Sequence, residues 1–407
     1  MTKLPKSKIN PEYNLAKIRV VGVGGAGCNA ISRMTDGLPR GVDLIAVNTD
    51  LQDLTHANAK KKIQIGKNAT KGLGTGMNPD LGRQAAEESR SEIADVLQGS
   101  DLIFITAGFG GGTGTGASPV IAEIAKDLGI LTIAVVTKPF GFEGSKRTQI
   151  AEEGLIKIRD RVDTLISIPN DRIFSLVDKD TSLLRAFEEI DEVLKNSVLG
   201  ITEVITIPGT INIDFADIKT IIQDGGSAII GVGVGSGPDR SVAAANMAIH
   251  SPLLETSIDG AKGVLFSIAG HKDLKMSEVN EIAKLIAENV DPSAKIIFGS
   301  HHDRKLKKGQ IKVTLVATGF NGHITRNNVL FSALPFTAPS KKEEVFNPSR
   351  SLKALGEAES REGEEGDQGK PLFDKAFDSN LVSGEGDKKE EVWDIPAFLR
   401  KKKRKRR

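Results

Sequence analysis

The sequence predicts an α/β fold: a parallel, doubly wound (Rossmann-like) domain, a long central helix, and a second, smaller α/β domain with a mixed sheet. Short apolar runs typical of buried strands alternate with helical patterns between residues 18 and 168. Residues 180–203 then carry apolar side chains at helical spacing. Beyond about residue 335, Ser, Glu, Gly, Lys and Asp dominate, which is typical of disordered chain.

These patterns divide the chain into six parts. They are a flexible N-terminal arm (1–16), the doubly wound domain (17–179), the central helix (180–203), a C-terminal domain (204–335), a disordered linker (336–389) and a C-terminal peptide with a basic tail (390–407).

Composition limits the class of protein. A single cysteine, Cys28, excludes a disulfide framework. The chain shows neither a signal-peptide core nor an apolar run long enough to span a membrane, so we expect a cytoplasmic protein without a transmembrane segment. The formal net charge is +2, and residues 400–407 alone contribute +8, which leaves −6 on the rest. An acidic body with a basic tip is not typical of a dedicated nucleic-acid-binding protein.

The first element, a strand over residues 18–23, ends in a glycine turn, and a helix is predicted from about residue 28 to 35. A second strand covers 43–48. The pattern matches a dinucleotide-binding fingerprint made of Gly22, Gly24, Gly27 and Asp50. One alternative is therefore a Rossmann-type, NAD-dependent oxidoreductase.

A longer glycine run, at residues 107–116, follows a strand predicted at 101–106 and precedes a helix predicted at 117–126. Six of the nine residues from Gly108 to Gly116 are glycines, so backbone N–H groups can approach a ligand closely. At a helix N-terminus such groups favour binding of an anion, and phosphate is the expected ligand. We refer to residues 107–116 as the signature loop.

The rest of the first domain continues the alternation. A second glycine loop at 71–79 leads into a helix over 80–96, and further strands are predicted at 130–137 and 164–168, with a helix at 145–158 between them. Such alternation gives a parallel sheet whose ligands bind at the carboxyl ends of the strands. The glycine loops therefore converge at one edge of the sheet.

The central helix carries one apolar stripe and would extend about 36 Å, long enough to link two domains. Glu188, Glu189 and Asp191 are out of place there as core residues. The stripe consists of Leu183, Leu184, Phe187, Ile190, Leu194, Val198 and Ile201.

A polar segment, residues 211–217, enters a helix that ends near residue 223. Asp214 and Asp217 lie three residues apart, on one face of its first turn. Capping of the helix by carboxylates explains them as well as a functional role does.

The C-terminal domain is predicted to hold strands at 228–234, 263–268, 294–298 and 311–317, with helices at 241–250 and 276–288. Its two consecutive last strands indicate a mixed sheet. In the tail, Trp393 and its apolar neighbours follow a polar tether, which is typical of a short recognition motif. A transient helix over 372–381 is a further expectation.

Several chemistries are excluded by missing motifs. The sequence has no G-x-x-x-x-G-K-[ST] loop, no protein-kinase set and no histidine pair at helical i, i+4 spacing. Cys28 has no histidine nearby in sequence and is expected to be a packing residue.

Several motifs resemble the tubulin/FtsZ family, in the order found in its bacterial members. Besides the signature Gly110-Gly-Gly-Thr-Gly-Thr-Gly116, they are Gly24-Gly-Ala-Gly-Cys-Asn29, Gly72-Leu-Gly-Thr-Gly-Met-Asn-Pro79, Pro139-Phe-Gly-Phe-Glu-Gly144, Ile168-Pro-Asn-Asp171, Asn212-Ile-Asp-Phe-Ala-Asp217 and Asp394-Ile-Pro-Ala-Phe-Leu-Arg400. The resemblance covers residues 16–335 and the tail.

The resemblance implies a GTPase that binds GTP or GDP, with Mg²⁺ held mainly through the phosphates. Residues 17–179 would be the GTP-binding domain, in which Glu143 and Arg147 would hold the ribose, Asn170 and Asp191 would read the guanine edge, and Phe187 would pack on the ring. Thr113 would lie near the terminal phosphate, and the loop at residues 74–78 would close over that phosphate and respond to its loss. Residues implied in binding are Gly24, Gly25, Ala26, Asn29, Gly74, Gly76, Gly110, Gly111, Gly112, Thr113, Gly114, Thr115, Glu143, Arg147, Asn170, Phe187 and Asp191.

The same resemblance implies that catalysis requires assembly. Asp214 and Asp217 would enter the next subunit's pocket and polarise the attacking water, with Asn212 orienting them, so that head-to-tail filaments form the division ring. Residues 204–335 would then be a GTPase-activating domain. The C-terminal peptide would bind division proteins and membrane anchors of the FtsA, SepF or ZipA type at midcell, beneath the inner membrane.

Overall fold

A computed structural model gives the structure of the chain. It describes residues 16–320 apart from positions 36, 40, 176, 178, 179, 252–256 and 304. The predicted arm up to residue 15, the linker, the C-terminal peptide and the candidate helix at 372–381 lie outside the described residues. Among the helices that are described, none has the length and apolarity that a membrane span requires.

The first six strands form the predicted parallel sheet, in the order β3-β2-β1-β4-β5-β6. The bounds are β1 Ile18–Val23, β2 Val42–Asn48, β3 Lys61–Gln64, β4 Leu102–Gly108, β5 Leu131–Lys138 and β6 Thr164–Pro169. This is the doubly wound order. β3 was not predicted, because this edge strand buries only Ile63 and so has no apolar run.

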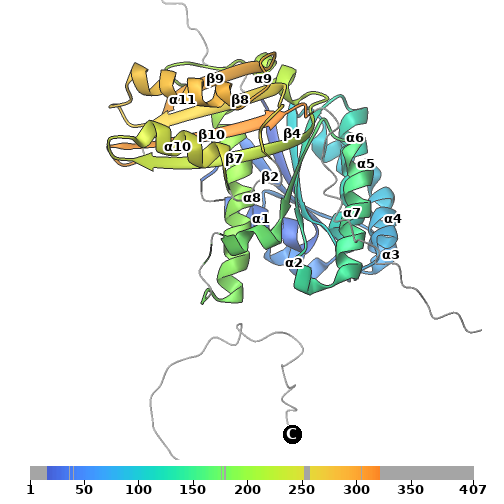
Figure 1. Ribbon diagram of the computed structural model, residues 1–407. Coiled ribbons are helices and arrows are strands. Elements are labelled where there is room, and N and C mark those ends of the chain that lie inside the picture. Colours follow the sequence, from blue (N-terminus) through green and yellow to red (C-terminus); the bar gives the residue numbers. More distant parts are fainter. Residues whose placement is uncertain are drawn as a thin grey trace, which may run out of the picture. The chain divides into compact units, whose positions relative to one another are not determined.

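Helices cover both faces of this sheet (Figure 1). Alternate side chains of β1 point to opposite layers: Val20 joins the core formed with α1 and α8, whereas Val21 joins the core formed with α4 to α7. The bounds are α1 Gly24–Met34, α2 Leu51–His56, α3 Lys67–Thr70, α4 Pro79–Glu88, α5 Arg90–Leu97, α6 Thr113–Asp127, α7 Ser145–Arg159 and α8 Leu183–Thr206, with short 3₁₀ turns at Gly141–Glu143 and Asn170–Ser175.

The helices that follow the glycine runs begin earlier than predicted. The first turn of α1 starts at Gly24 and that of α6 at Thr113, inside segments predicted as loops. Glycine lowers intrinsic helix propensity, but tertiary packing overrides it here. The single helix predicted over 80–96 is two helices, because the chain breaks at Ser89, whose hydroxyl accepts a hydrogen bond from the Gly66 nitrogen at 3.3 Å.

The central helix α8 begins at Leu183, three residues later than predicted, where the Ser182 hydroxyl accepts from the Arg185 nitrogen. The second half of its apolar stripe is buried, from Ile190 to Ile201. Its first half is not: Leu184 is 68% exposed and Phe187 40% exposed. The stripe therefore serves the core only from Ile190 onward.

The C-terminal domain holds the predicted mixed sheet, in the order β7-β10-β8-β9, with antiparallel pairs except for β8 and β9. Helices α10 and α11 pack on one face of it. The first three residues of β7 also pair in parallel with β6, so all ten described strands are continuous. The bounds are α9 Phe215–Ile222, β7 Gly226–Ser236, α10 Arg240–Ile249, β8 Gly263–Gly270, α11 Met276–Glu288, β9 Lys295–His302 and β10 Gln310–Thr318.

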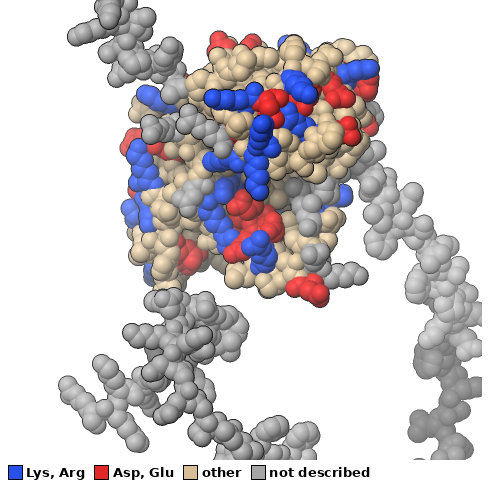
Figure 2. Space-filling model, turned by 90° about the vertical axis from the view of Figure 1, so that its left-hand side faces the viewer, with Lys and Arg blue, Asp and Glu red and all other residues tan. Residues whose placement is uncertain are grey.

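The surface charge is mixed on the face that Figure 2 shows. Lys and Arg side chains lie beside Asp and Glu side chains over the middle of this face. On α8, Arg185 forms an ion pair with Glu189, and Lys195 forms one with Glu192.

Candidate nucleotide-binding site

A cavity of about 400 Å³ lies at the carboxyl ends of the parallel strands. This volume falls in the range of small-molecule sites. Thirteen residues of the predicted binding set line it, from all the glycine loops and from α8. They are Gly24, Gly25, Ala26, Gly74, Gly76, Gly111, Gly112, Thr113, Gly114, Glu143, Arg147, Asn170 and Phe187.

At one end of the cavity two helix N-termini meet. A side chain at Gly24 would put its Cβ 2.9 Å from the Gly114 nitrogen, so the starts of α1 and α6 are in direct contact. Both helices have unpaired N–H groups in their first turns and direct their positive dipole ends here. This arrangement favours a phosphate group.

The loop at residues 71–78 covers the same end. It lies directly on Gly112, where a Cβ would come 2.6 Å from the Gly76 carbonyl oxygen. Only glycine permits this approach. The Thr75 side chain reaches the Thr113 hydroxyl at 2.9 Å, so this loop and the signature loop are bonded to each other.

The other end of the cavity offers polar and aromatic groups. Glu143 forms an ion pair with Arg147 and accepts a hydrogen bond from the Phe140 nitrogen at 2.9 Å, which fixes both side chains. The Phe187 ring packs edge-on against Phe140, with 5.6 Å between centroids.

Asn170 is 7% exposed, and its Oδ1 has no hydrogen-bond donor among the described residues. A buried amide oxygen left unpaired beside a cavity is suited to a ligand donor.

Asp191 does not line the cavity. It lies one helical turn beyond Phe187, and its carboxylate pairs with Arg33, whose Nε is 3.1 Å away. Burial raises the pKa of Asp191 to about 6 even though Arg33 opposes the shift, and Glu188 and Glu192 add to it.

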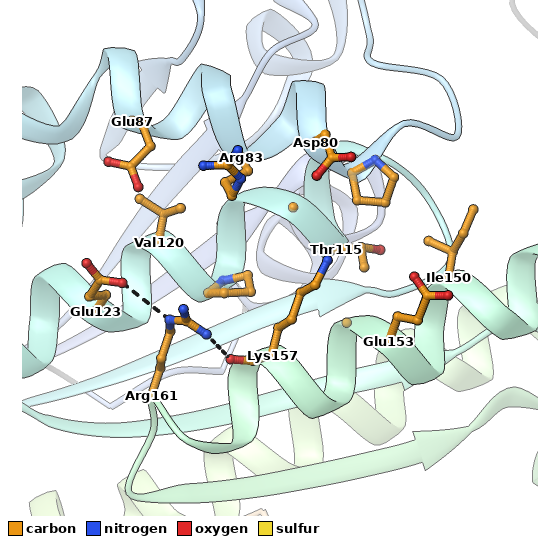
Figure 3. A pocket seen from close by; sticks show the side chains of 14 residues that line it. Asp80, Arg83, Glu87, Thr115, Val120, Glu123, Ile150, Glu153, Lys157 and Arg161 are labelled. Carbon is orange, nitrogen blue, oxygen red and sulfur yellow. Dashed lines mark hydrogen bonds and ion pairs between the residues drawn. The ribbon is translucent and has the colours of Figure 1, made fainter.

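Three other predicted residues lie outside the cavity. Asn29 is exposed on α1, and Gly110, within the signature loop, faces Arg147, whose carbonyl oxygen would lie 3.0 Å from a Cβ at this position. The Thr115 hydroxyl accepts from the Gly110 nitrogen at 3.0 Å. Its side chain borders a separate, smaller pocket between α4, α6 and α7 (Figure 3). Thr115 thus stabilises the conformation of the signature loop through its bond to Gly110 and does not face the cavity.

The predicted catalytic residues Asn212, Asp214 and Asp217 lie beyond the other end of α8 and are all exposed. Asp214 is the N-cap of α9 and accepts from the Ala216 nitrogen at 3.3 Å; Asn212 accepts from the Gly209 nitrogen at 2.6 Å. The Asp217 carboxylate has no partner among the described residues. Capping accounts for Asp214 locally, and Asp217 lies in the first turn of α9, where a carboxylate interacts favourably with the helix dipole.

Sequence reasoning did not assign several individual cavity residues, notably Asn48 at the end of β2, Asp53 in α2 and Thr75 in the 71–78 loop. Asn48 is 2% exposed, and its Nδ2 has no acceptor among the described residues. Burial, together with the nearby Asp50, raises the pKa of Asp53. Asn48 could have been found from its place at the carboxyl end of a strand, two residues before Asp50, which also lines the cavity and caps α2.

Comparisons with known proteins agree with this geometry. A family model described as the tubulin/FtsZ family GTPase domain matches residues 17–178, and one for the FtsZ family C-terminal domain matches residues 226–321. An empty FtsZ dimer from M. jannaschii is similar, with 48% identity over 75% of this chain and 88% of that one and a TM-score of 0.71. A tryptophan-to-tyrosine variant of FtsZ from M. jannaschii is also similar, with 47% identity over 75% of this chain and 92% of that one and a TM-score of 0.72.

GDP-bound CetZ1 from Haloferax volcanii shares the fold at 22% identity, covering 75% of this chain and 95% of that one with a TM-score of 0.65. The cavity, the loops that line it and both matched domains lead to one assignment. The chain belongs to the tubulin/FtsZ family and carries its GTPase domain followed by an FtsZ C-terminal domain.

Proposed function

We propose that the protein binds GTP or GDP in the cavity, hydrolyses GTP, and assembles head-to-tail into filaments. The observation that carries the proposal is the meeting of two helix N-termini under the glycine loops, in a chain with a tubulin/FtsZ GTPase domain. The phosphates lie against Gly24 to Ala26 and Gly111 to Gly114.

The sugar and base occupy the other end of the cavity. Glu143 and Arg147 hold the ribose, and the unpaired Oδ1 of Asn170 accepts from the base. Phe187 is 40% exposed and presents a ring face for stacking. Asp191 lies on the same helix face one turn further on. We propose that its carboxylate accepts a hydrogen bond from the guanine amine once the Arg33 side chain moves away from it.

Magnesium fits the phosphate end. Asp50 and Asp53 line the cavity near Gly74 and Gly25, and the Thr75 and Thr113 hydroxyls add oxygen atoms. Mg²⁺ prefers such oxygen donors and keeps several waters between itself and the protein. Bound there, it would neutralise charge on the phosphates.

Hydrolysis uses acids from a second copy. Asp214 and Asp217 are exposed and lie about 30 Å from Phe187 along α8, too far to serve the cavity of their own chain. In a head-to-tail pair they enter the neighbour's cavity, where they orient and deprotonate the attacking water, with Asn212 positioning them. A contact of this heterologous kind extends into an open filament.

In the cell, we propose that these filaments form the cytokinetic ring of a bacterium at midcell, in the cytoplasm beneath the inner membrane. The C-terminal peptide, outside the described residues, binds division proteins and membrane anchors of the FtsA, SepF or ZipA type. The apolar cluster around Trp393 on a polar tether supports this assignment.

The test is a comparison of GTP, ATP and NAD binding, followed by light scattering and phosphate release with GTP. We expect GTP selectivity, scattering that needs GTP, and turnover per molecule that rises steeply with protein concentration. Preference for NAD would favour the oxidoreductase, and constant specific activity at all concentrations would exclude the shared site.

A further inference from the structure

The segment between α8 and α9 is attached to the edge of the C-terminal sheet through one residue. β9 is the last strand of that sheet, and its Ser300 carbonyl oxygen accepts from the nitrogens of Thr210 at 2.8 Å and Ile211 at 3.2 Å. The Ser300 nitrogen in turn donates to the Ile211 carbonyl oxygen at 3.0 Å, so the two residues form an isolated antiparallel bridge. Both main-chain groups of Ser300 therefore face away from β8 and toward this segment.

Glycine at position 209 lets the segment lie this close to β9. A Cβ there would come 2.2 Å from the Ser300 carbonyl oxygen and 3.2 Å from that of Ile211. The φ angle of Gly209 lies outside the left-handed region, so the close contact requires glycine and the backbone conformation does not. Gly299 makes room for Ile213 in the same way, because a Cβ at 299 would lie 2.9 Å from the Ile213 Cδ1.

The bridge determines which side chains of the segment face outward. Ile211 and Ile213 are partly buried, whereas Asn212 and Asp214 are exposed, so the side chains alternate as they do along an extended strand. A slip of one residue against Ser300 would turn the isoleucines outward and the polar side chains inward. The Ile211–Ser300 pairing thus sets the register of the segment that carries two of the proposed catalytic residues.

We propose that Ser300 is a positioning residue for GTP hydrolysis: its main chain holds residues 209–213 in the register that presents Asn212 and Asp214 to the next subunit. This rests on the proposed function and assigns part of the catalytic geometry to a strand of the C-terminal domain. The chain's own cavity lies near the start of α8, and the segment lies beyond its end. Loss of the bridge should therefore change turnover and leave nucleotide affinity unchanged.

Two substitutions in the full chain disturb the bridge from opposite sides. Ser300→Pro removes the donated N–H and places ring atoms against the Ile211 carbonyl oxygen, while β8 loses no hydrogen bond. Gly209→Ala forces the segment to move by about 1 Å, a displacement that can cost about a hundredfold in rate.

Ile296→Pro is the matched control on the same strand. Ile296 lies four residues before Ser300, so its N–H faces the same open side of β9, where none of the described strands pairs. Proline is tolerated at such a position. This variant therefore puts a proline into the same strand edge without touching the bridge.

Phosphate release at several GTP concentrations, with calorimetry below the concentration at which scattering rises, separates turnover from affinity. We expect kcat per subunit in sedimented filaments to fall about a hundredfold in Ser300→Pro and Gly209→Ala, with GTP affinity within about twofold of the wild type. Ile296→Pro should keep wild-type turnover. Amide hydrogen exchange at Thr210 and Ile211 should become faster only in the two bridge variants.

A mixture shows whether Gly209→Ala keeps a working cavity. Its partner is Gly112→Val, which retains the bridge but whose added side chain collides with the 71–78 loop in the cavity. An intact segment then meets an intact cavity across the subunit contact, so turnover should reappear. Asp214→Asn mixed with Gly112→Val is the reference, because it tests the shared site without disturbing the bridge.

Full turnover in both bridge variants, or an equal loss in Ile296→Pro, overturns the inference. Turnover in the reference mixture but none in the mixture with Gly209→Ala overturns it as well, because the defect would then be general misfolding. Turnover in neither mixture, or a wild type that does not hydrolyse GTP, overturns the proposed function instead.

Discussion

The Nε of Arg33, on α1, lies 3.1 Å from the carboxylate of Asp191, on α8. The Asp191 side chain is only 14% exposed, and desolvation of its carboxyl group outweighs the attraction of the guanidinium, so its pKa is raised to about 6. The residue proposed to recognise guanine therefore changes its charge close to physiological pH.

This pKa predicts an acid-sensitive affinity. Only the carboxylate accepts hydrogen bonds from guanine, so lowering the pH to 5.5 should weaken nucleotide binding about fourfold through Asp191 alone. The Asp191→Asn variant should bind the nucleotide more weakly than the wild type, and its affinity should lack this part of the pH dependence. Phosphate protonation affects both proteins alike, so the difference between their pH profiles reports Asp191, and identical profiles would contradict its role.

The same pKa shift predicts that folding stability, unlike nucleotide affinity, decreases as the pH rises. The folded protein holds the Asp191 proton more tightly than the unfolded chain, whose pKa is near 3.8, so this group's contribution to folding falls as the pH rises from about 4 to about 6. Asp191→Asn removes this dependence. Urea unfolding at pH 5 and pH 7 measures it, and the variant should gain stability relative to the wild type at pH 7.

Asp214→Asn separates catalysis from helix capping. Asparagine caps helices as well as aspartate does, so α9 should be preserved, whereas the charge that activates water is lost. We expect near-normal GTP binding and turnover reduced at least a hundredfold. Asp214→Ala, which also loses the cap, should in addition lower stability by about 1 kcal/mol. Loss of GTP binding in Asp214→Asn would contradict this proposal, because it would mean that Asp214 contributes to nucleotide binding.

Mixing two variants tests whether the acids come from a neighbour. The mixture pairs Asp214→Asn, which keeps its pocket, with Gly112→Val, which keeps its loop but whose Cβ collides with Thr75 and Gly76 in the pocket. Neither variant alone should hydrolyse GTP, and turnover should reappear in the mixture, where an intact loop meets an intact pocket across the subunit contact. If Asp214 served its own chain, the mixture would stay as inactive as each variant alone.

Gly116→Ala should destabilise the fold. Its Cβ would lie 2.0 Å from the Pro79 carbonyl oxygen and 2.7 Å from the Arg83 nitrogen, so α4 must move away from α6. Alanine favours helices over glycine by about 1 kcal/mol, but a backbone collision of this kind costs more, and we expect a net loss of about 1–3 kcal/mol. Gly111→Ala is the matched control for thermal unfolding, because no atom lies within 4 Å of its Cβ.

Much of the fold follows from the sequence because buried strands need apolar runs. β1 was predicted to the residue, and the other strands with such runs to within a few residues. β3 has no such run, and the early starts of α1 and α6 are hidden because glycine itself gives no helical signal. These features are set by neighbouring elements, which a single segment does not encode.

For the site, the glycine motifs predicted the phosphate end, and most of those residues line the cavity. The Arg33–Asp191 pair and the Thr75–Thr113 hydrogen bond were not predictable, because each joins segments that are distant in sequence. Thr75 in particular is one threonine among glycines until the fold places it against Thr113.

β7 belongs to both sheets: Gly226 to Ala228 pair with β6, and the strand then pairs with β10. Cutting the chain between α8 and α9 would therefore leave β6 with an unpaired edge on one fragment and the start of β7 uncovered on the other. Two such fragments would complement each other's edges when co-expressed. The protein is thus suited to use as a split reporter, in which recovery of GTP turnover indicates that the two fragments have associated.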